Sequence, residues 1–347
     1  MSHIPAINMN VFELTGALVD IESVTGNEEQ VGEYLFAHLS SLAAKHAGQA
    51  ERQRVEPGRF NVLATWGKPL VTLSTHMDTV PPFFPSSENE EFIRGRGACD
   101  AKGIIAAMIA TAEVLLEKGA KNFALLFVVG EERNGAGAIA ASKSPCGSRF
   151  LINGEPTENL MALGSKGSLR YELVSRGRLA HSAYPELGHS AIETLLDVLE
   201  DIRRIPLPED ALLGRSTLNI GTLSGGRAPN VIADHAQADL LFRLVGDAAP
   251  IRAAVTAAAA GHAEAREVVY SPAQRLEAFE NFPTTVVSFT TDIPSFAGTW
   301  GRPFLIGPGS IHLAHSAEEH VPKKQLLEAV EIYARLVNSL LAAEEGK

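Results

Sequence analysis

Leu70-Val71-Thr72-Leu73 leads through Ser74 into Thr75-His76-Met77-Asp78, and this is the most informative part of the chain. An apolar run of this length is typical of a buried strand, and open α/β sheets place their ligand sites where such strands end. Because residues two apart share a strand face, Asp78 can orient the imidazole of His76 if the strand pairing lasts that far. Alone, the pair fits either a metal site or a histidine that closes a strand.

Four further segments place potential metal ligands behind a strand or a tight loop. In chain order they supply Asp100 after a glycine-rich turn, Glu131 and Glu132 after a strand predicted at 123–129, Glu155 after a strand predicted at 150–153, and His315 in a loop that begins Gly-Pro-Gly. Two histidines and three carboxylates, with a further carboxylate as base, can hold two divalent ions if one carboxylate bridges them.

These five motifs, in this order from His76 to His315, resemble those of the di-zinc amidohydrolases and exopeptidases. That family includes acetylornithine deacetylase, succinyl-diaminopimelate desuccinylase, aminoacylase-1 and glutamate carboxypeptidase. The resemblance implies that Asp100 bridges two Zn²⁺ ions, that His76 and Glu155 complete one site, and that Glu132 and His315 complete the other. The mixed donor set would also accept Co²⁺ or Mn²⁺.

The resemblance also implies that Glu131 is the general acid/base and that Asp78 supports His76. Adjacent residues at a strand end point in different directions, so Glu132 can bind a metal while Glu131 faces the substrate water. The chain departs from the commoner family pattern at Ala101, where many members have a second aspartate. The preceding peptide bond is cis in relatives, and the sequence leaves open whether it is cis here.

The order of predicted elements indicates an α/β fold with an inserted α+β domain. Residues 1–167 and 273–347 are expected to form a catalytic domain, a mainly parallel sheet with helices on both faces. Residues 168–272 are expected to form a four-stranded sheet with two helices. The resemblance makes this insert a lid that also forms a homodimer.

Arg178-Leu179-Ala180-His181-Ser182-Ala183-Tyr184-Pro185 resembles the lid motif of this family. The resemblance assigns His181 to the active site of a neighbouring subunit, where it holds the carbonyl oxygen of the substrate. The resemblance gives substrate contacts to Tyr184, Asn230, Arg243, Gly309 and Ser310, with Arg243 as a clamp for a carboxylate. Without the resemblance, Arg243 would be an ordinary charge on a sheet surface. His312 would share a face with His315 if that segment were helical, but Gly307-Pro308-Gly309 favours a loop.

Composition narrows the classes of function further. The 347 residues carry 30 basic and 41 acidic side chains, a net charge of −11, and no block rich in lysine or arginine, so we expect no nucleic-acid binding. Residues 1–8 lack the pattern of a signal peptide, and Gly103–Leu116 is too short to span a bilayer. With Cys99 and Cys146 as the two cysteines, we expect a cytoplasmic protein that does not bind membranes.

The expected function is a metal-dependent amidohydrolase that cleaves the amide of an N-acyl amino acid, of the deacetylase or desuccinylase type. The string Gly-Pro-Gly-Ser-Ile-x-x-Ala-His is similar to that of acetylornithine deacetylases. The alternative within the family is a dipeptidase or carboxypeptidase that acts on a peptide-like amide with the same metals. The alternative from another class, a non-catalytic metal-binding homologue, would have no use for Glu131.

Overall fold

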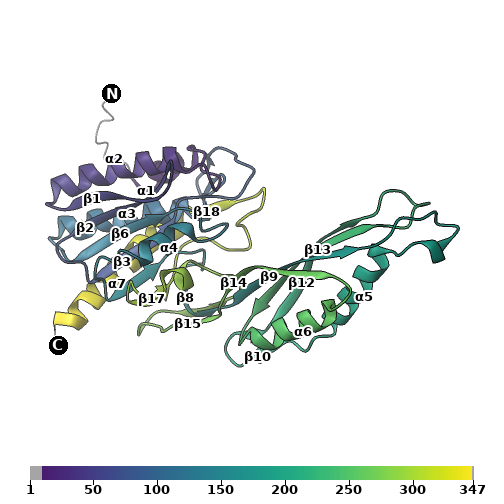
Figure 1. Ribbon diagram of the computed structural model, residues 1–347. Coiled ribbons are helices and arrows are strands. Elements are labelled where there is room, and N and C mark those ends of the chain that lie inside the picture. Colours follow the sequence, from purple (N-terminus) through teal and green to yellow (C-terminus); the bar gives the residue numbers. More distant parts are fainter. Residues whose placement is uncertain (1–9, 346–347) are drawn as a thin grey trace. The chain divides into compact units, whose positions relative to one another are not determined.

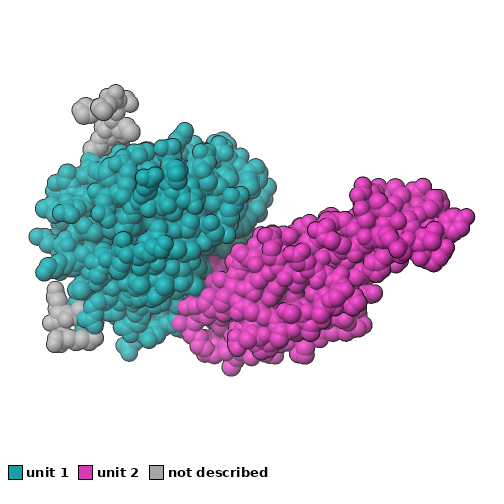
Figure 2. Space-filling model, viewed as in Figure 1, with its two compact units in different colours: residues 1–163, 276–285, 291–347 teal, residues 164–275, 286–290 magenta. Residues whose placement is uncertain are grey.

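The computed structural model describes residues 10–345, which divide into two compact units (Figures 1 and 2). Unit 1 comprises residues 1–163, 276–285 and 291–347, and unit 2 comprises residues 164–275 and 286–290. Each unit buries a hydrophobic core of its own. The expectation that the first eight residues form no signal peptide falls outside the described residues.

Unit 1 is built on a mixed, mainly parallel six-stranded sheet. Its strand order is β1 (Gln49–Glu56), β2 (Arg59–Trp66), β6 (Phe123–Val128), β3 (Val71–His76), β7 (Phe150–Asn153) and β17 (Arg302–Leu305). The last four strands run parallel to one another, whereas β1 and β2 pair in the antiparallel sense. The carboxyl ends of four neighbouring strands therefore meet along one edge.

Helices cover both faces of this sheet, so its central strands are buried on both sides. In β6, Phe123, Leu125 and Phe127 pack into the larger core, and the intervening Ala124, Leu126 and Val128 pack into the smaller one. The larger core contains side chains from α1 (Val11–Val19), α2 (Glu29–Lys45), α3 (Lys102–Glu117) and α7 (Lys323–Glu345). The smaller contains side chains from α4 (Ala136–Ser142) and η2 (Ile293–Phe296).

The two tryptophans of the chain lie in unit 1, one in each core. Trp66 ends β2 and stacks on Phe123 in the larger core, with ring centroids 5.0 Å apart. Trp300 packs in the smaller core and donates a hydrogen bond from its indole nitrogen to the carbonyl oxygen of Ala141, at 2.9 Å. Both side chains are almost completely buried.

Unit 2 is a four-stranded antiparallel sheet with helices packed against it. The strand order is β12 (Thr217–Gly225), β13 (His235–Leu244), β9 (Gly167–Arg176) and β14 (Glu264–Ser271). Alternate residues of β13 are buried against α5 (Ala191–Arg203) and α6 (Ala249–Ala259). The predicted fold class, a mainly parallel catalytic sheet with a separate four-stranded α+β domain, is confirmed.

The limits of unit 2 differ by a few residues from those expected from the sequence, 168 and 272. The unit begins at Gly164 and takes in residues 286–290. Long-range pairing explains the difference, since the backbone N–H of Lys166 donates to the carbonyl of Val287, and Arg243 donates to Thr290. Such pairing leaves no signal in local sequence.

Short strands complete the fold. They are β4 (Ser87–Glu88), β5 (Phe92–Arg94) and β18 (His320–Pro322) in one small sheet, β8 (Met161–Ser165), β15 (Gln274–Arg275) and β16 (Thr284–Val287) in another, and the pair β10 (Glu209–Asp210) and β11 (Gly214–Arg215). A short 3₁₀ helix, η1, spans Pro185–Leu187. Among the described residues no helix is both long and apolar enough to cross a membrane.

Candidate metal centre and active site

The candidate ligands lie at or just beyond the carboxyl ends of the parallel strands. His76 is the last residue of β3, Glu132 follows β6, and Glu155 follows β7. Asp100 precedes α3, and His315 lies in turns after β17. Residues far apart in the chain are thus placed at one edge of the sheet, where α/β folds bind ligands.

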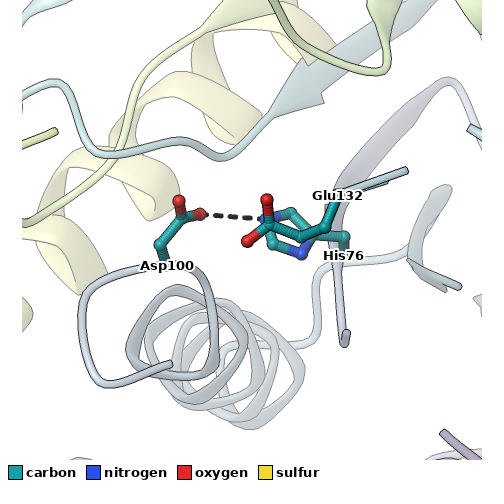
Figure 3. Close-up of side chains that lie close together, drawn as sticks. All are labelled: His76, Asp100 and Glu132. Carbon is teal, nitrogen blue, oxygen red and sulfur yellow. Dashed lines mark hydrogen bonds and ion pairs between the residues drawn. The ribbon is translucent and has the colours of Figure 1, made fainter. Parts of the chain in front are cut away.

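Asp100 contacts both histidines. Its Oδ1 lies 2.9 Å from Nε2 of His76, and its Oδ2 lies 3.4 Å from Nε2 of His315, which is also 3.0 Å from Oε1 of Glu132. Figure 3 shows Asp100 reaching His76 from the loop ahead of a helix, with Glu132 beside the imidazole ring. Ligand atoms of His76, Asp100 and Glu132 all lie within 4.8 Å of one another, an arrangement that can hold a metal ion.

Glu155 tests whether a cation fits this cluster. Its side chain is buried, and its Oε1 has no hydrogen-bond partner. Burial raises the pKa of this carboxyl well above its usual value, and the neighbouring Asp100 raises it further, although His76 opposes the shift. A buried carboxylate without donors is costly unless a cation compensates it, so the residues present fit a metal centre.

Asp78 is predicted to orient the imidazole of His76, and its carboxylate makes further contacts in the site. Its carboxylate accepts hydrogen bonds from the Thr25 hydroxyl at 2.8 Å and from the backbone N–H groups of Glu131 and Glu132 at 3.1 and 3.2 Å. Nδ1 of His76 lies 3.6 Å from this carboxylate but only 3.0 Å from the main-chain carbonyl of Asp78. The direct hydrogen bond to the imidazole is therefore made by the backbone, because β3 ends at His76.

Glu131 has the electrostatic surroundings of a proton acceptor. Burial raises the pKa of its carboxyl well above the usual value, and the charges of Glu155, Asp292 and Glu132 add to the rise, while His76 opposes it. No hydrogen bond joins its carboxylate to another described side chain in the ligand cluster. A carboxyl group tuned upward in this way is suited to general acid/base work near neutral pH.

Sequence reasoning missed two buried acids beside this cluster, Asp292 and Glu319. Burial raises the pKa of Asp292 to about 7, and the charges of Asp78 and Glu132 contribute. Its sequence context, Asp-Ile-Pro, is that of an ordinary helix cap. Asp292 is the N-cap residue of η2, but its side chain makes no capping hydrogen bond, so only the fold reveals its place beside the ligands.

The loop after β17 distinguishes between the two candidate histidines. Residues 311–315 form turns rather than a helix, and His315 has a φ of 63°. His315 makes the carboxylate contacts given above, whereas none is found for His312 among the described residues. The peptide bond between Asp100 and Ala101 is cis, which answers the question left open by the sequence.

Gly309 and Ser310 lie in a hydrogen-bonded loop. The N–H of Gly309 donates to Oε1 of Gln325 at 2.7 Å, and the Ser310 hydroxyl donates to Glu158 at 2.7 Å. A Cβ on Gly309 would come 2.5 Å from Sγ of Cys99, and its φ of 87° also favours glycine. Their contact with substrate remains a prediction.

The remaining predicted residues belong to unit 2 and fall into two places. His181, Tyr184 and Asn230 lie together, since the N–H of Ser182 donates to the carbonyl of Asn230 at 3.1 Å and the rings of His181 and Tyr184 are 6.3 Å apart. Arg243 lies near the other end of β13, half buried, and its guanidinium donates to Thr290 at 3.4 Å.

The carboxylates around His315 should leave a signature in the pH dependence of stability. In the metal-free protein, hydrogen bonds to Asp100 and Glu132 raise the pKa of His315 from 6.5 to about 10. A raised pKa stabilises the fold below the unfolded value, and this contribution is lost as pH rises toward the folded value. We expect the unfolding midpoint of the metal-free protein to fall between pH 6.5 and 10 more steeply than that of His315→Ala, measured by calorimetry.

His312→Ala is the matched control and should keep the wild-type slope. Identical slopes for wild type and His315→Ala would show that the ion pairs contribute nothing in solution. Added Zn²⁺ competes with the proton for the imidazole, so its affinity should rise with pH over the same interval.

Comparisons with known proteins agree with this geometry. The model of Peptidase family M20/M25/M40 matches residues 72–339. A Peptidase M20 domain-containing protein of Schizosaccharomyces pombe is 39% identical over 340 residues, covering 94% of this chain and 84% of that protein. A protein of Aspergillus terreus named "Probable carboxypeptidase" is 36% identical over 371 residues, covering 93% of this chain and 85% of its own.

A solved structure shares the fold at low sequence identity. The M20 family metallo-carboxypeptidase of Sulfolobus solfataricus superposes with a TM-score of 0.78 at 16% identity, covering 95% of this chain and 98% of that one. The family match spans all the candidate ligands from His76 to His315, and the relatives cover nearly the whole chain. The chain therefore belongs to the M20/M25/M40 family of metallopeptidases.

Proposed function

We propose that this chain is a metal-dependent exopeptidase of the carboxypeptidase or dipeptidase type, which hydrolyses the amide next to a free carboxylate. The observation that carries the proposal is the ligand cluster around Asp100 together with Glu131, whose carboxyl has a raised pKa. Such a centre could serve either a peptidase or a deacylase, and the names of the relatives help to choose between them. They favour the alternative reading of the sequence over the N-acyl amino acid deacetylase first expected.

The residues that would hold the metals are the five predicted ligands. Asp100 lies between His76 and His315, as a bridging carboxylate must, and the unpartnered oxygen of Glu155 offers a further donor. Two Zn²⁺ ions, or Co²⁺ or Mn²⁺ in their place, would supply an acidified water and polarise the amide carbonyl.

Glu131 moves the proton in this proposal. Its carboxylate accepts a proton from the attacking water and returns it to the leaving amine. Asp78 fixes the direction of Glu131, because it accepts the backbone N–H of that residue, and it fixes Glu132 in the same way. The carboxylate of Asp78 therefore holds the backbone of both residues, Glu132 as the metal ligand and Glu131 as the base.

Substrate recognition is assigned to unit 2 and to the loop after β17. Arg243 would bind the free carboxylate of the substrate, and a planar guanidinium suits that task. His181 would donate to the carbonyl oxygen of the scissile amide, with Asn230 and Tyr184 beside it. Gly309 and Ser310, in unit 1, would also contact the substrate.

The places of Arg243 and His181 within unit 2 favour a dimer. β13 runs from His235 to Leu244, so a strand rise of 3.3 Å per residue puts about 26 Å between His235 and Arg243. His181 bridges to Val231, before β13 begins. One small substrate cannot touch both residues of a single subunit, so we assign His181 to the active site of a partner subunit.

Unit 2 also has a surface suited to such a dimer. β12 is an edge strand of the sheet, and residues 221–230 are all exposed. The large apolar side chains Leu223 and Leu196 are about half exposed, on β12 and the neighbouring α5. Exposed sheet edges and exposed large apolar side chains are typical of association sites.

A substrate panel tests the proposed reaction. With Zn²⁺ or Co²⁺ supplied, dipeptides and peptides with a free carboxyl terminus should be hydrolysed, and the same compounds with an amidated carboxyl terminus should not. N-acetyl and N-succinyl amino acids form the comparison set. Faster hydrolysis of that set would return the assignment to the deacylase, and no turnover of any amide would reject a hydrolase of either type.

Glu131→Gln should keep the metals and lose turnover. The amide side chain cannot accept the proton, and general-base assistance is worth about 10² to 10⁴ in rate. Metal analysis beside steady-state kinetics measures both quantities. Retention of more than about a tenth of normal activity would exclude Glu131 as the base.

His181→Ala should lower the turnover number by about 10² to 10³ without changing metal content, because a donor to the developing oxyanion is lost. Mixed with Glu131→Gln subunits, it should form hybrids in which one active site has both groups intact. Activity approaching about a quarter of normal is expected for random exchange. Exchange of subunits without any recovery, or an active monomer, would place the action of His181 within its own chain.

A further inference from the structure

Glu319 is a buried acid that neither the ligand set nor the proton transfer uses. Its side chain is 1% exposed, and it precedes β18 in the segment that also carries His315. We propose that Glu319 is the positioning residue for Asp100, holding the loop of the bridging carboxylate in register with the loop of His315. This inference rests on the proposed metal centre and adds to it a residue outside the ligand set.

The side chain of Glu319 accepts hydrogen bonds from several backbone N–H groups of the loop that carries Asp100. Its Oε1 accepts hydrogen bonds from the N–H groups of Gly97 at 2.9 Å, Cys99 at 3.2 Å and Asp100 at 3.1 Å. The last of these belongs to the bridging residue itself. Three donors on one oxygen define the course of residues 97–100, and therefore the point from which the Asp100 carboxylate starts.

Arg96 holds the other oxygen of Glu319. Its guanidinium lies 2.5 Å from Oε2, donates to the carbonyl of Pro82 at 3.2 Å and covers the ring of Phe84 at 4.9 Å. Both partners of this ion pair are almost fully buried. The carboxylate is thus held in place from both sides.

The backbone of Glu319 couples the two ligand loops directly. Its carbonyl accepts the N–H of Gly95 at 3.2 Å, and Val321 pairs with Ile93 where β18 meets β5. His315 stands four residues earlier in the same segment. The segment that supplies one histidine ligand therefore also supplies the clamp on the carboxylate that contacts that histidine at 3.4 Å.

Metal affinity tests the proposal independently of any substrate. We expect Glu319→Ala to weaken binding of Zn²⁺ about 10- to 100-fold at both sites, since the shared carboxylate is misplaced. Competition with a chromogenic chelator measures the affinity, and elemental analysis measures the equivalents bound. The stabilisation that Zn²⁺ adds to the unfolding midpoint should shrink in parallel.

Glu318→Ala is the matched control, because Glu318 is the adjacent residue of the same type but is exposed, and within the described part of the chain its side chain pairs only with Arg94, at 3.5 Å. It should bind Zn²⁺ as wild type does. Glu319→Gln keeps the side-chain length and an oxygen for the three backbone N–H groups, so its affinity for Zn²⁺ should lie between that of Glu319→Ala and that of wild type. If the alanine variant does not fold, the glutamine variant decides.

The outcomes separate this inference from the proposed function. Wild-type Zn²⁺ affinity in a folded Glu319→Ala or Glu319→Gln variant, with only the metal-free midpoint lowered, would make Glu319 a purely structural residue and overturn the proposal. Loss confined to one of the two equivalents would also overturn it. A wild-type protein that binds no Zn²⁺ would instead reject the metal centre on which the proposed function rests.

Discussion

Repulsion among buried carboxylates at one edge of the unit 1 sheet is the constraint on which the site depends. Burial acts to raise the pKa of every acid in this group, and the net shift is upward for all of them except Asp100: the group is Asp100, Glu131, Glu132, Glu155 and Asp292. Asp100 is the exception because the hydrogen bonds to His315 and His76 overcome its burial and lower its pKa. A fold that concentrates so much negative charge away from water must provide compensating cations and donors.

Two further acids at this edge bind backbone N–H groups rather than metal. Asp78 gathers the amides of the loop after β6, and Glu319 gathers those of the loop before α3. Each thereby converts a flexible connection into a fixed support for a ligand. Rigidity at the edge is achieved by hydrogen bonding within the loops, since the strands themselves end before most of the functional residues begin.

Local sequence was sufficient where an element and its ligand are adjacent in the chain. The apolar runs before His76, Glu132 and Glu155 predict strand ends, and parallel strands end at one edge. Alternating patterns predicted the second sheet in the same way. These are signals of period and adjacency, which need no knowledge of what lies elsewhere in the fold.

Sequence was insufficient where the meaning of a residue comes from a distant partner. Glu319 beside Glu318 looks like part of a solvated acidic pair, and Asp292 looks like a helix cap, yet both are buried beside ligands from other segments. The imidazole of His76 lies within hydrogen-bond distance of the main-chain carbonyl of Asp78 rather than its carboxylate, and this depends on the residue at which β3 ends. Element boundaries and buried long-range contacts are fixed by the assembled core, which no local window contains.

The positions of the two tryptophans allow the two units to be distinguished by fluorescence. Trp66 and Trp300 sit on opposite faces of one sheet, and unit 2 contains tyrosines but no tryptophan. Indole emission therefore comes entirely from the unit that carries the metal ligands and samples both of its layers. Both units contribute to the circular dichroism signal. If the unfolding curve from circular dichroism differs from the curve from tryptophan emission, the inserted unit unfolds separately.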